Sequence, residues 1–197
     1  IAPCIACNQA CLDHTFQGKV STCLVNPKAC HETEIVVTPT DAPRRVAVVG
    51  AGPAGLAGAI ELARLAKKDG TELEIGVLEK SEELGQHCLS GAIVNPMAFR
   101  ELFQDLTDQD FPFRKKVNSE RIYIMTESGS LRLPTPPTMR NEGNYVASIC
   151  EMVRWLGAQA EELGVNLFTG FPADALLAEG DRVRGLRTTP GGLTKNG

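Results

Sequence analysis

The segment VVGAGPAGL, residues 48–56, restricts the fold more than any other part of this 197-residue chain. It places Gly50, Gly52 and Gly55 in the spacing GxGxxG, directly after a short apolar run and at the start of a helical pattern. In a strand–turn–helix unit the first glycine permits a tight turn and the second lets a phosphate approach the backbone. The third lets the helix pack closely on the strand. The motif therefore predicts a dinucleotide-binding turn.

The surrounding sequence supplies the context that this motif needs. Residues 44–50 read as a buried strand, residues 53–70 as a helix and residues 72–80 as a second strand. This order predicts a βαβ unit of parallel strands with a right-handed crossover. Pro53 and Ala54 begin the helix, whose N-terminal N–H groups and partial positive charge favour phosphates. The alternative interpretation is an ordinary βα turn with no ligand.

Glu79 ends the second strand, 24 residues after Gly55, and Lys80 follows it. A carboxylate at this place accepts hydrogen bonds from ribose hydroxyls and repels a 2′-phosphate, which disfavours NADP. The motif itself does not distinguish FAD from NAD.

The rest of the chain continues as mixed α/β and contains no internal repeat. The expected elements are helices over 96–106 and 148–163, a hairpin over 121–134 that turns at Ser128-Gly129, and strands over 165–171, 173–178 and 182–188. The last two strands are joined by a turn at 179–181. Strands that alternate with helices are typical of a Rossmann-like fold.

Four of the seven cysteines lie within twenty residues, at Cys4, Cys7, Cys11 and Cys23. A segment of about 40 residues rarely buries enough apolar surface to fold alone, and bound metal is a usual remedy. Three closely spaced thiolates and one distant thiolate favour an iron–sulfur cluster over zinc, which prefers paired CxxC motifs. Zinc and unligated thiols remain the alternatives, and under the zinc interpretation Cys30 and His31 are substitute ligands.

The other cysteines and histidines favour structural roles. Cys88 and Cys150 are expected to be small buried residues, and His14 and His87 to be surface or hydrogen-bonded loop residues. No side chain stands out as a catalytic acid, base or nucleophile.

Composition limits the function classes. Hydrophobic residues make up 43% and charged residues 22%, with a net charge of −4, so the chain is globular and no nucleic-acid surface is indicated. No apolar run is long enough to cross a bilayer. Cysteines of this kind fit a reducing compartment, and we expect a cytoplasmic protein or one peripheral to the inner face of a bacterial membrane.

The predicted organisation is a cysteine-rich [4Fe-4S] module over 1–38, a linker over 39–45 and a Rossmann-like FAD-binding domain of the glutathione-reductase-like class over 46–197. The chain begins at Ile1 and stops in a loop sequence at Gly197, so we expect the FAD-binding domain to be incomplete, with flanking domains missing.

Two family resemblances extend these predictions. The segments PCIACNQACLD, GKVSTCLVNPKACHETE and RRVAVVGAGPAGLA, within residues 3–57, resemble the junction between the iron–sulfur and flavin parts of bacterial 2,4-dienoyl-CoA reductases, relatives of trimethylamine dehydrogenase. This resemblance implies that Cys4, Cys7, Cys11 and Cys23 hold a [4Fe-4S] cluster that relays electrons to FAD, with Cys30 outside the ligand set.

From residue 46 the chain resembles electron-transfer flavoprotein–ubiquinone oxidoreductases, through the segments ELEIGVLEKSEELGQHCLSGAIVNP, RIYIMTESGSLRLP, NEGNYV and WLGAQAEELGVNLFTGF. This resemblance implies that the glycine motif and Glu79 hold FAD, and that Ser90 and Gly91 pass close to the flavin. It also implies an electron-transferring oxidoreductase whose partners are electron-transfer flavoprotein and a quinone.

The two resemblances overlap at VAVVGAGPAGLA, so the chain is interpreted as a natural fusion or as a chimeric fragment. The alternative functions are the FAD and iron–sulfur part of an NADPH-dependent 2,4-dienoyl-CoA reductase, and a non-enzymatic, zinc-stapled nucleotide-binding module. The isolated chain is expected to be inactive.

Overall fold

The computed structural model describes residues 10–21, 29–33, 45–88, 90–180 and 182–191. The chain divides into two compact units, residues 1–42 and 43–197. The division falls within the segment 39–45 that the sequence predicts to be a linker.

The described part of the first unit contains one short helix, α1 (Ala10–Phe16). The backbone carbonyl of Cys11 accepts hydrogen bonds from the Thr15 hydroxyl at 2.8 Å and the Ser21 hydroxyl at 3.3 Å. His14 Nδ1 lies 2.8 Å from the carbonyl oxygen of Val20. His14 is thus hydrogen-bonded, as expected, but it lies in a helix and not in a loop.

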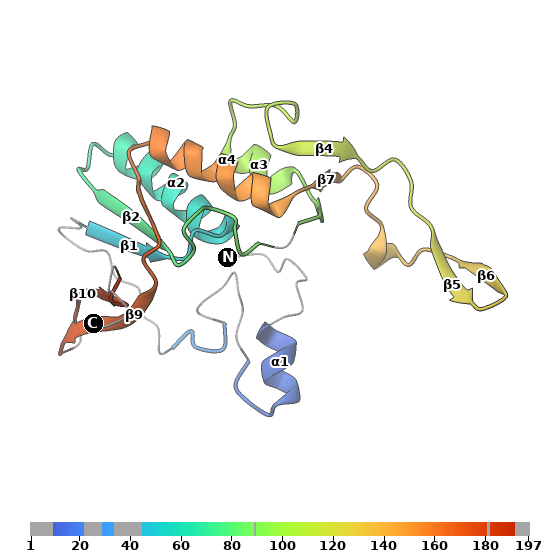
Figure 1. Cartoon of the computed structure of the whole chain (residues 1–197), viewed down its shortest axis with the longest axis horizontal. Helices are drawn as coiled ribbons and strands as arrows, with labels where there is room; N and C mark the ends of the chain where they lie inside the picture. The colour runs from blue at the N-terminus through green and yellow to red at the C-terminus, as the bar shows by residue number, and fades with distance from the viewer. Residues whose placement is uncertain (1–9, 22–28, 34–44, 89, 181, 192–197) are drawn as a thin grey trace. The chain divides into compact units, whose positions relative to one another are not determined.

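The second unit is built on the predicted βαβ unit (Figure 1). Strand β1 (Arg45–Val49) pairs in parallel with β2 (Glu74–Glu79), and helix α2 (Pro53–Lys68) connects them. Strand β8 (Asn166–Thr169) adds in parallel to the other side of β2, which gives the strand order β1-β2-β8. The prediction of a parallel α/β sheet is confirmed.

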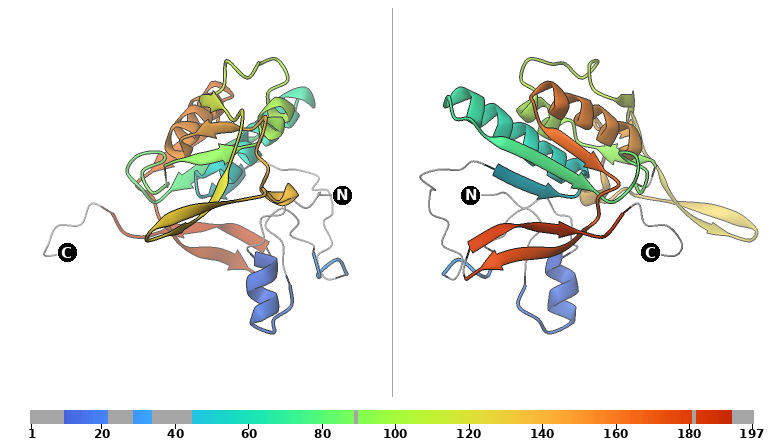
Figure 2. Two further views of the ribbon diagram at one scale, coloured as in Figure 1. Left: turned by 90° about the vertical axis from the view of Figure 1, so that its right-hand side faces the viewer. Right: turned by 60° about the vertical axis from the view of Figure 1, so that its left-hand side comes forward.

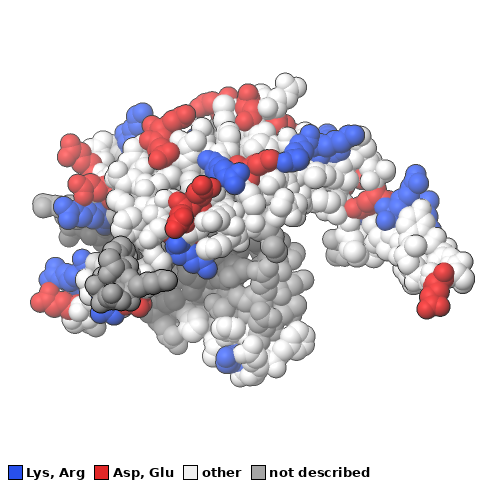
Figure 3. All heavy atoms as spheres, in the orientation of Figure 1, with Lys and Arg blue, Asp and Glu red and all other residues white. Residues whose placement is uncertain are grey.

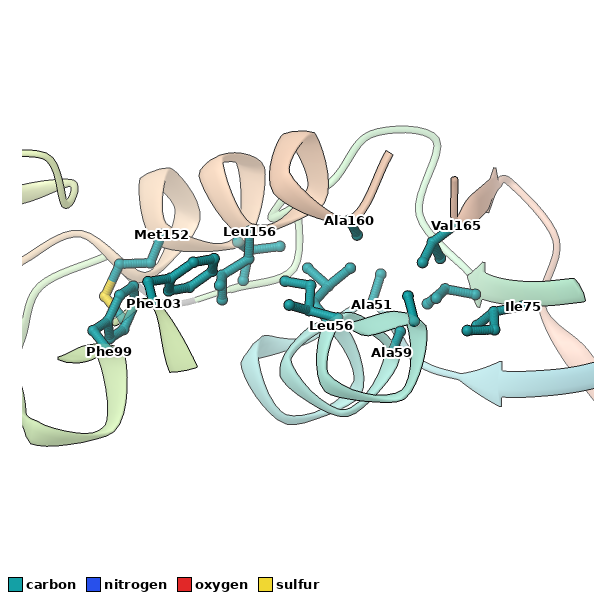
Figure 4. Packing of buried hydrophobic residues seen from close by; sticks show 14 of the residues in the cluster. Ala51, Leu56, Ala59, Ile75, Phe99, Phe103, Met152, Leu156, Ala160 and Val165 are labelled. Carbon is teal, nitrogen blue, oxygen red and sulfur yellow. The ribbon is translucent and has the colours of Figure 1, made fainter. Parts of the chain in front are cut away.

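Helices α2 and α4 (Ile149–Glu162) cover one face of this sheet (Figure 1). Leu56 and Ile60 of α2 and Val153 of α4 are fully buried, together with Val77 of β2. Figure 4 labels Ala59 on α2 and Ala160 on α4, and both small side chains are fully buried. The two helices pack on each other and bury their apolar faces together.

An aromatic cluster extends this core beyond the sheet. Phe99 and Phe103 lie against Trp155 of α4, with ring centroids 6.0 and 4.8 Å away, and Phe111 and Phe113 complete the cluster. Helix α3 (Met97–Leu102) is shorter than the predicted helix over 96–106. Phe103 leaves the helical conformation (φ −125°, ψ 73°), and its ring is buried in the cluster. Burial of this ring therefore ends the helix earlier than the sequence pattern indicates.

A small antiparallel sheet was not predicted from the sequence. Its strand order is β3 (Ala92–Val94), β7 (Tyr145–Ala147) and β4 (Phe113–Lys116). Each strand has only three or four residues, too few to produce a clear alternation of apolar and polar positions. A single 3₁₀ turn, η1 (Pro137–Met139), precedes β7.

Two hairpins complete the unit. The predicted hairpin over 121–134 is present as β5 (Ile122–Thr126) and β6 (Gly129–Leu133). Its turn is at Glu127-Ser128 and not at Ser128-Gly129, because Gly129 already pairs with Thr126. Strands β9 (Ala173–Glu179) and β10 (Arg182–Thr188) form the second expected hairpin.

The face of the parallel sheet opposite the helices adjoins β9 and β10 (Figure 2). A cavity of about 500 Å³ lies between them, and its lining includes Ala47, Gly76, Phe168 and Leu176. Phe168 lies over Gly76, where an added Cβ would approach the ring to 3.1 Å. This cavity is mainly apolar, and Val49, the residue before Gly50, also lines it.

Charged side chains of both signs are interspersed on the surface that Figure 3 draws. Among the described helices, none is long and apolar enough to span a bilayer.

Asp108 ties α3 to the small antiparallel sheet. Its two carboxylate oxygens accept hydrogen bonds from the Arg100 guanidinium at 2.7 and 2.6 Å, and Tyr145 of β7 donates its hydroxyl proton at 2.8 Å. The Arg100 hydrogen bonds, helped by Tyr145, lower the pKa of Asp108 from 3.8 to about 2 despite partial burial. A carboxylate with a depressed pKa stabilises the folded state above its unfolded pKa.

We expect Asp108→Asn to lower the free energy of unfolding at pH 7 by about 1 to 2 kcal/mol, since the Arg100 side chain is 55% exposed and solvent weakens the pair. The deficit relative to the parent chain should shrink as the pH falls from about 4 to about 2, where the parent's Asp108 is protonated. Urea denaturation at several pH values measures this. Asp105→Asn, at an exposed position, is the control. If Asp108→Asn lowered the free energy of unfolding equally at every pH, this interpretation of Asp108 would be contradicted.

Candidate dinucleotide-binding site

The glycine motif forms the turn between β1 and α2. Gly50 has φ +99°, a conformation that favours glycine, and its N–H donates to the carbonyl of Leu78 on β2 at 2.7 Å. Gly50 therefore fixes the chain reversal at the carboxyl end of the sheet. In open α/β sheets, ligands bind at this end of the strands.

Gly55 sets how closely α2 approaches β1. A Cβ atom at this position would lie 2.0 Å from the backbone oxygen of Gly50 and 3.3 Å from the Val48 side chain. A backbone oxygen inside the turn cannot move aside without displacing the strand. The third glycine of the motif is thus required by packing, as predicted.

Gly52 and the N-terminus of α2 face open space. Gly52 is the N-cap residue in an extended conformation, and no other described residue has an atom within 4 Å of the position of an added Cβ. The first helical hydrogen bond runs from the N–H of Leu56 to the carbonyl of Gly52 at 3.0 Å, and no described side chain caps the helix. Pro53 and Ala54 are exposed. The uncapped end, with its partial positive charge, suits a phosphate.

Glu79 is held beside this turn by three hydrogen bonds. Its Oε2 accepts the N–H of Ala51 at 3.0 Å, and its Oε1 accepts the N–H of Ser81 at 3.0 Å. The Ser81 hydroxyl lies 2.8 Å from Oε1 and 2.9 Å from the carbonyl oxygen of Glu83, so its single proton has two acceptors. Because a carboxylate oxygen can accept two hydrogen bonds, Oε2 retains one position for a ligand hydroxyl.

The electrostatic surroundings keep Glu79 ionised. Partial burial acts to raise its pKa, but the hydrogen bonds from Ser81 and Ala51 and the nearby charge of His87 outweigh this, and the pKa is lowered. His87 is exposed, as expected, and contributes through its charge. A carboxylate that is charged at neutral pH is thus present at the end of β2.

A pocket of about 220 Å³ lies next to Gly50 and Glu79, and the exposed Lys80 lines it. Its other wall comes from Phe171, Pro172 and Ala173, which follow β8. The N–H of Phe171 donates to the Glu79 carbonyl at 2.9 Å, and the N–H of Gly170 donates to the Ser81 carbonyl at 2.7 Å. These residues were not predicted to line the site, because nothing local in the sequence links residue 171 to residue 79.

Ser81 was also missed, although its position two residues after the predicted acid was a usable signal. It is buried, and it positions the Glu79 carboxylate through its N–H and its hydroxyl.

Ser90 and Gly91 are not brought to the glycine turn by any contact of the described residues. Both are exposed, and Gly91 has φ +88° just before β3. Their role beside a flavin remains a prediction.

The predicted metal ligands fall mostly outside the described residues. Cys4, Cys7 and Cys23 lie there, and of the four only Cys11, half-buried in α1, is described. The described residues contain no group of three or more metal-ligating side chains. The iron–sulfur and zinc interpretations therefore both stay as sequence predictions.

Comparison with known families agrees with the geometry of the turn. The model of the family described as an NAD(P)-binding Rossmann-like domain matches residues 48–103, which begin within β1 and include the glycine turn, α2 and Glu79. The fold of this region is thus Rossmann-like.

Relatives extend the match over most of the chain. The mitochondrial electron transfer flavoprotein–ubiquinone oxidoreductase of Dictyostelium discoideum is 45% identical over 153 residues, which are 77% of this chain and 25% of that protein. The electron transfer flavoprotein–ubiquinone oxidoreductase of Pseudomonas aeruginosa is 42% identical over 157 residues, 77% of this chain and 28% of that protein. This chain is similar to one part of these oxidoreductases. It spans about a quarter of their length.

Solved structures share the fold. CtdE in complex with FAD and a substrate superposes with a TM-score of 0.54 at 20% identity, covering 76% of this chain and 35% of that one. A geranylgeranyl bacteriochlorophyll reductase-like protein of Thermoplasma acidophilum gives a TM-score of 0.52 at 25% identity, covering 75% and 35%. The relatives support the second of the two resemblances and carry no support for the one to 2,4-dienoyl-CoA reductases.

The glycine turn yields a test that separates packing from ligand binding. We expect Gly55→Ala to lower the free energy of unfolding by about 2 kcal/mol or more, since its methyl group meets the Gly50 backbone. Gly52→Ala should leave stability nearly unchanged and weaken dinucleotide binding at least tenfold, because its methyl group enters only the open space at the helix end.

Gly58→Ala is the matched control, an exposed position within α2 with no neighbouring atom within 4 Å. It should preserve binding and raise stability by about 0.5 to 1 kcal/mol. Thermal denaturation and fluorescence titration measure the two effects. Equal losses of stability for Gly52→Ala and Gly55→Ala would contradict the assignment.

Proposed function

We propose that residues 45–191 bind FAD at the carboxyl end of the parallel sheet. One observation carries the proposal: the ionised Glu79 carboxylate, with one acceptor position free, lies beside an uncapped helix N-terminus and an open glycine turn. A ribose hydroxyl and a pyrophosphate are the groups that such a pair recognises.

The roles of the residues follow from their positions. Gly50 and Gly52 allow the pyrophosphate close to the backbone, and N–H groups at the start of α2 bind it. Glu79, positioned by Ser81, accepts a ribose hydroxyl. The pocket beside Phe171 has about 220 Å³, room for part of an adenosine group.

FAD is favoured over NAD by the proteins that this chain is similar to. The matched relatives are named as oxidoreductases that act with a flavoprotein, and a solved structure of the same fold holds FAD. Bound FAD supplies reversible one- and two-electron chemistry, while the protein supplies binding, orientation and electrostatics. No described side chain is assigned as a catalytic acid or base.

We further propose that the whole protein transfers electrons from an electron-transfer flavoprotein to a quinone, as the names of the relatives state for those proteins. A lipid-soluble quinone lies in a bilayer, so the protein would work at a membrane surface. Anaerobic mixing of the whole protein with reduced electron-transfer flavoprotein and a short-chain ubiquinone tests this. Quinone reduction is expected. Its absence in FAD-loaded protein would contradict the assignment of these partners but not the proposed FAD site.

The FAD assignment is tested by titration with three ligands. We expect FAD to bind one per chain, ADP to compete with it and FMN to bind much more weakly, since FMN lacks the adenosine group. Glu79→Gln should weaken FAD binding by about 1.5 to 3 kcal/mol, the usual effect of losing a hydrogen bond to a charged group. Glu82→Ala, exposed on the same segment, is the control and should bind as the parent does. Equal affinity for FMN and FAD would rule out this site.

We also propose that Cys4, Cys7, Cys11 and Cys23 hold a [4Fe-4S] cluster, on the support of their spacing. Anaerobically prepared protein should contain about four irons and four sulfides per chain. Cys7→Ser should lower both, since a hydroxyl is a poorer ligand for iron in a cluster than a thiolate is, whereas Cys30→Ser should not. One zinc per chain without labile sulfide would refute the cluster.

A further inference from the structure

The segment that follows Glu79, residues 80–88, is attached to helix α4. Leu84 packs against Gly157, where an added Cβ would lie 2.2 Å from a Leu84 methyl group. The Arg154 guanidinium donates to the Leu84 carbonyl at 3.3 Å. Gly85 is buried against the backbone of Cys150, whose carbonyl oxygen lies 2.8 Å from the position of an added Cβ. These three contacts hold one side of the segment along the helix.

Cys88, the last residue of this segment, lies next to Cys150 of α4. The Cys150 thiol donates a hydrogen bond to the Cys88 carbonyl at 3.1 Å, across 62 residues of sequence. Both are free thiols and half-buried, so they are less buried than expected, although Cys88 packs against the hydrophobic core. A carbonyl contact of this length puts the sulfur of one cysteine next to the backbone of the other. A disulfide needs the two sulfur atoms about 2 Å apart, so the Cys150 thiol must turn from the Cys88 carbonyl to the Cys88 sulfur before the bond can form.

We propose that Cys88 and Cys150 form a reversible intrachain disulfide, which fastens the segment after Glu79 to the first turn of α4. The oxidant is a low-molecular-weight disulfide. The thiolate of one cysteine attacks it, forms a mixed disulfide and releases one thiol. The second cysteine then displaces the other half of the oxidant. In total two S–H bonds are lost, one S–S bond forms in the protein, and the small disulfide is reduced to two thiols.

The surroundings of the pair slow the reaction of one thiol but leave both cysteines accessible and close together. Burial, followed by the neighbouring Cys150 and Glu79, raises the pKa of the Cys88 thiol, so it is protonated and slow to react in the reduced chain. Partial exposure of both residues leaves them accessible to a small oxidant. Contacts from Leu84, Gly85 and Arg154 keep the two cysteines together before the bond forms.

The disulfide would act on the nucleotide site through the chain. Cys88 is close enough to Glu79 for that carboxylate to affect its pKa, and Ser81, which positions the carboxylate, lies in the same segment. Fixing the segment should reduce the motion of Glu79 and slow the loss of a bound dinucleotide. This consequence rests on the proposed FAD site, whereas formation of the disulfide does not.

The test uses the whole chain with glutathione disulfide as the oxidant. After oxidation, free thiols are alkylated, the chain is digested without reduction, and peptides are identified by mass spectrometry. We expect a linked pair that contains Cys88 and Cys150, which dithiothreitol releases. The oxidised chain should melt at a higher temperature than the reduced chain, and Cys88→Ser and Cys150→Ser should abolish both effects. Cys30→Ser, at an exposed cysteine of the other unit, should abolish neither.

Two outcomes would overturn the proposal. One is the appearance of glutathione on Cys88 or Cys150 without the linked peptides. The other is a linked pair that leaves the melting temperature unchanged, because the bond would then not fasten the segment. The rate of FAD dissociation is measured separately on the oxidised and reduced chains. Failure of FAD to bind either form would contradict the proposed function and leave the disulfide supported.

Discussion

The close approach of α2 to β1 is the contact on which the rest of the second unit depends. The Gly50 oxygen occupies the space that any side chain at residue 55 would need. Because the helix can lie this close to the strand, Leu56 and Ile60 are fully buried, and α4 packs beside α2. The same approach leaves the helix N-terminus directly above the end of the strand. One steric constraint therefore produces both the core and the place where a phosphate would bind.

Glu79 connects that turn to a distant part of the chain. Its side chain accepts from Ala51 and Ser81, and its own backbone carbonyl accepts from Phe171 after β8. The pocket is therefore formed by three segments that converge on one residue. Loss of the carboxylate would leave the N–H of Ala51 without this acceptor, and so the side chain serves the fold of the site as well as a ligand.

The nucleotide site and the segment that supports it have different roles. The site is a binding module, and the chemistry that it would use belongs to FAD. Residues 80–88 form the support, held on α4 by the packing of Leu84 and Gly85 and the hydrogen bond from Arg154. A bond between Cys88 and Cys150 would strengthen the support without entering the site. Oxidation would then alter how firmly the nucleotide is held without altering which nucleotide is recognised.

The sequence by itself determined the βαβ unit, the roles of Gly50 and Gly55 and the acid at the end of β2, because these depend on spacing within some 35 consecutive residues. Both hairpins were likewise readable from local alternation, although pairing of Gly129 moved one turn by a residue. Tertiary structure alone decided what is distant in sequence. It ended α3 at the buried Phe103, assembled β3, β7 and β4 from strands too short to show a pattern, and brought Phe171 to Glu79 and Cys150 to Cys88. Such contacts arise from burial and strand pairing between segments that are distant in the sequence. The residues of one segment do not indicate which distant segment it will contact.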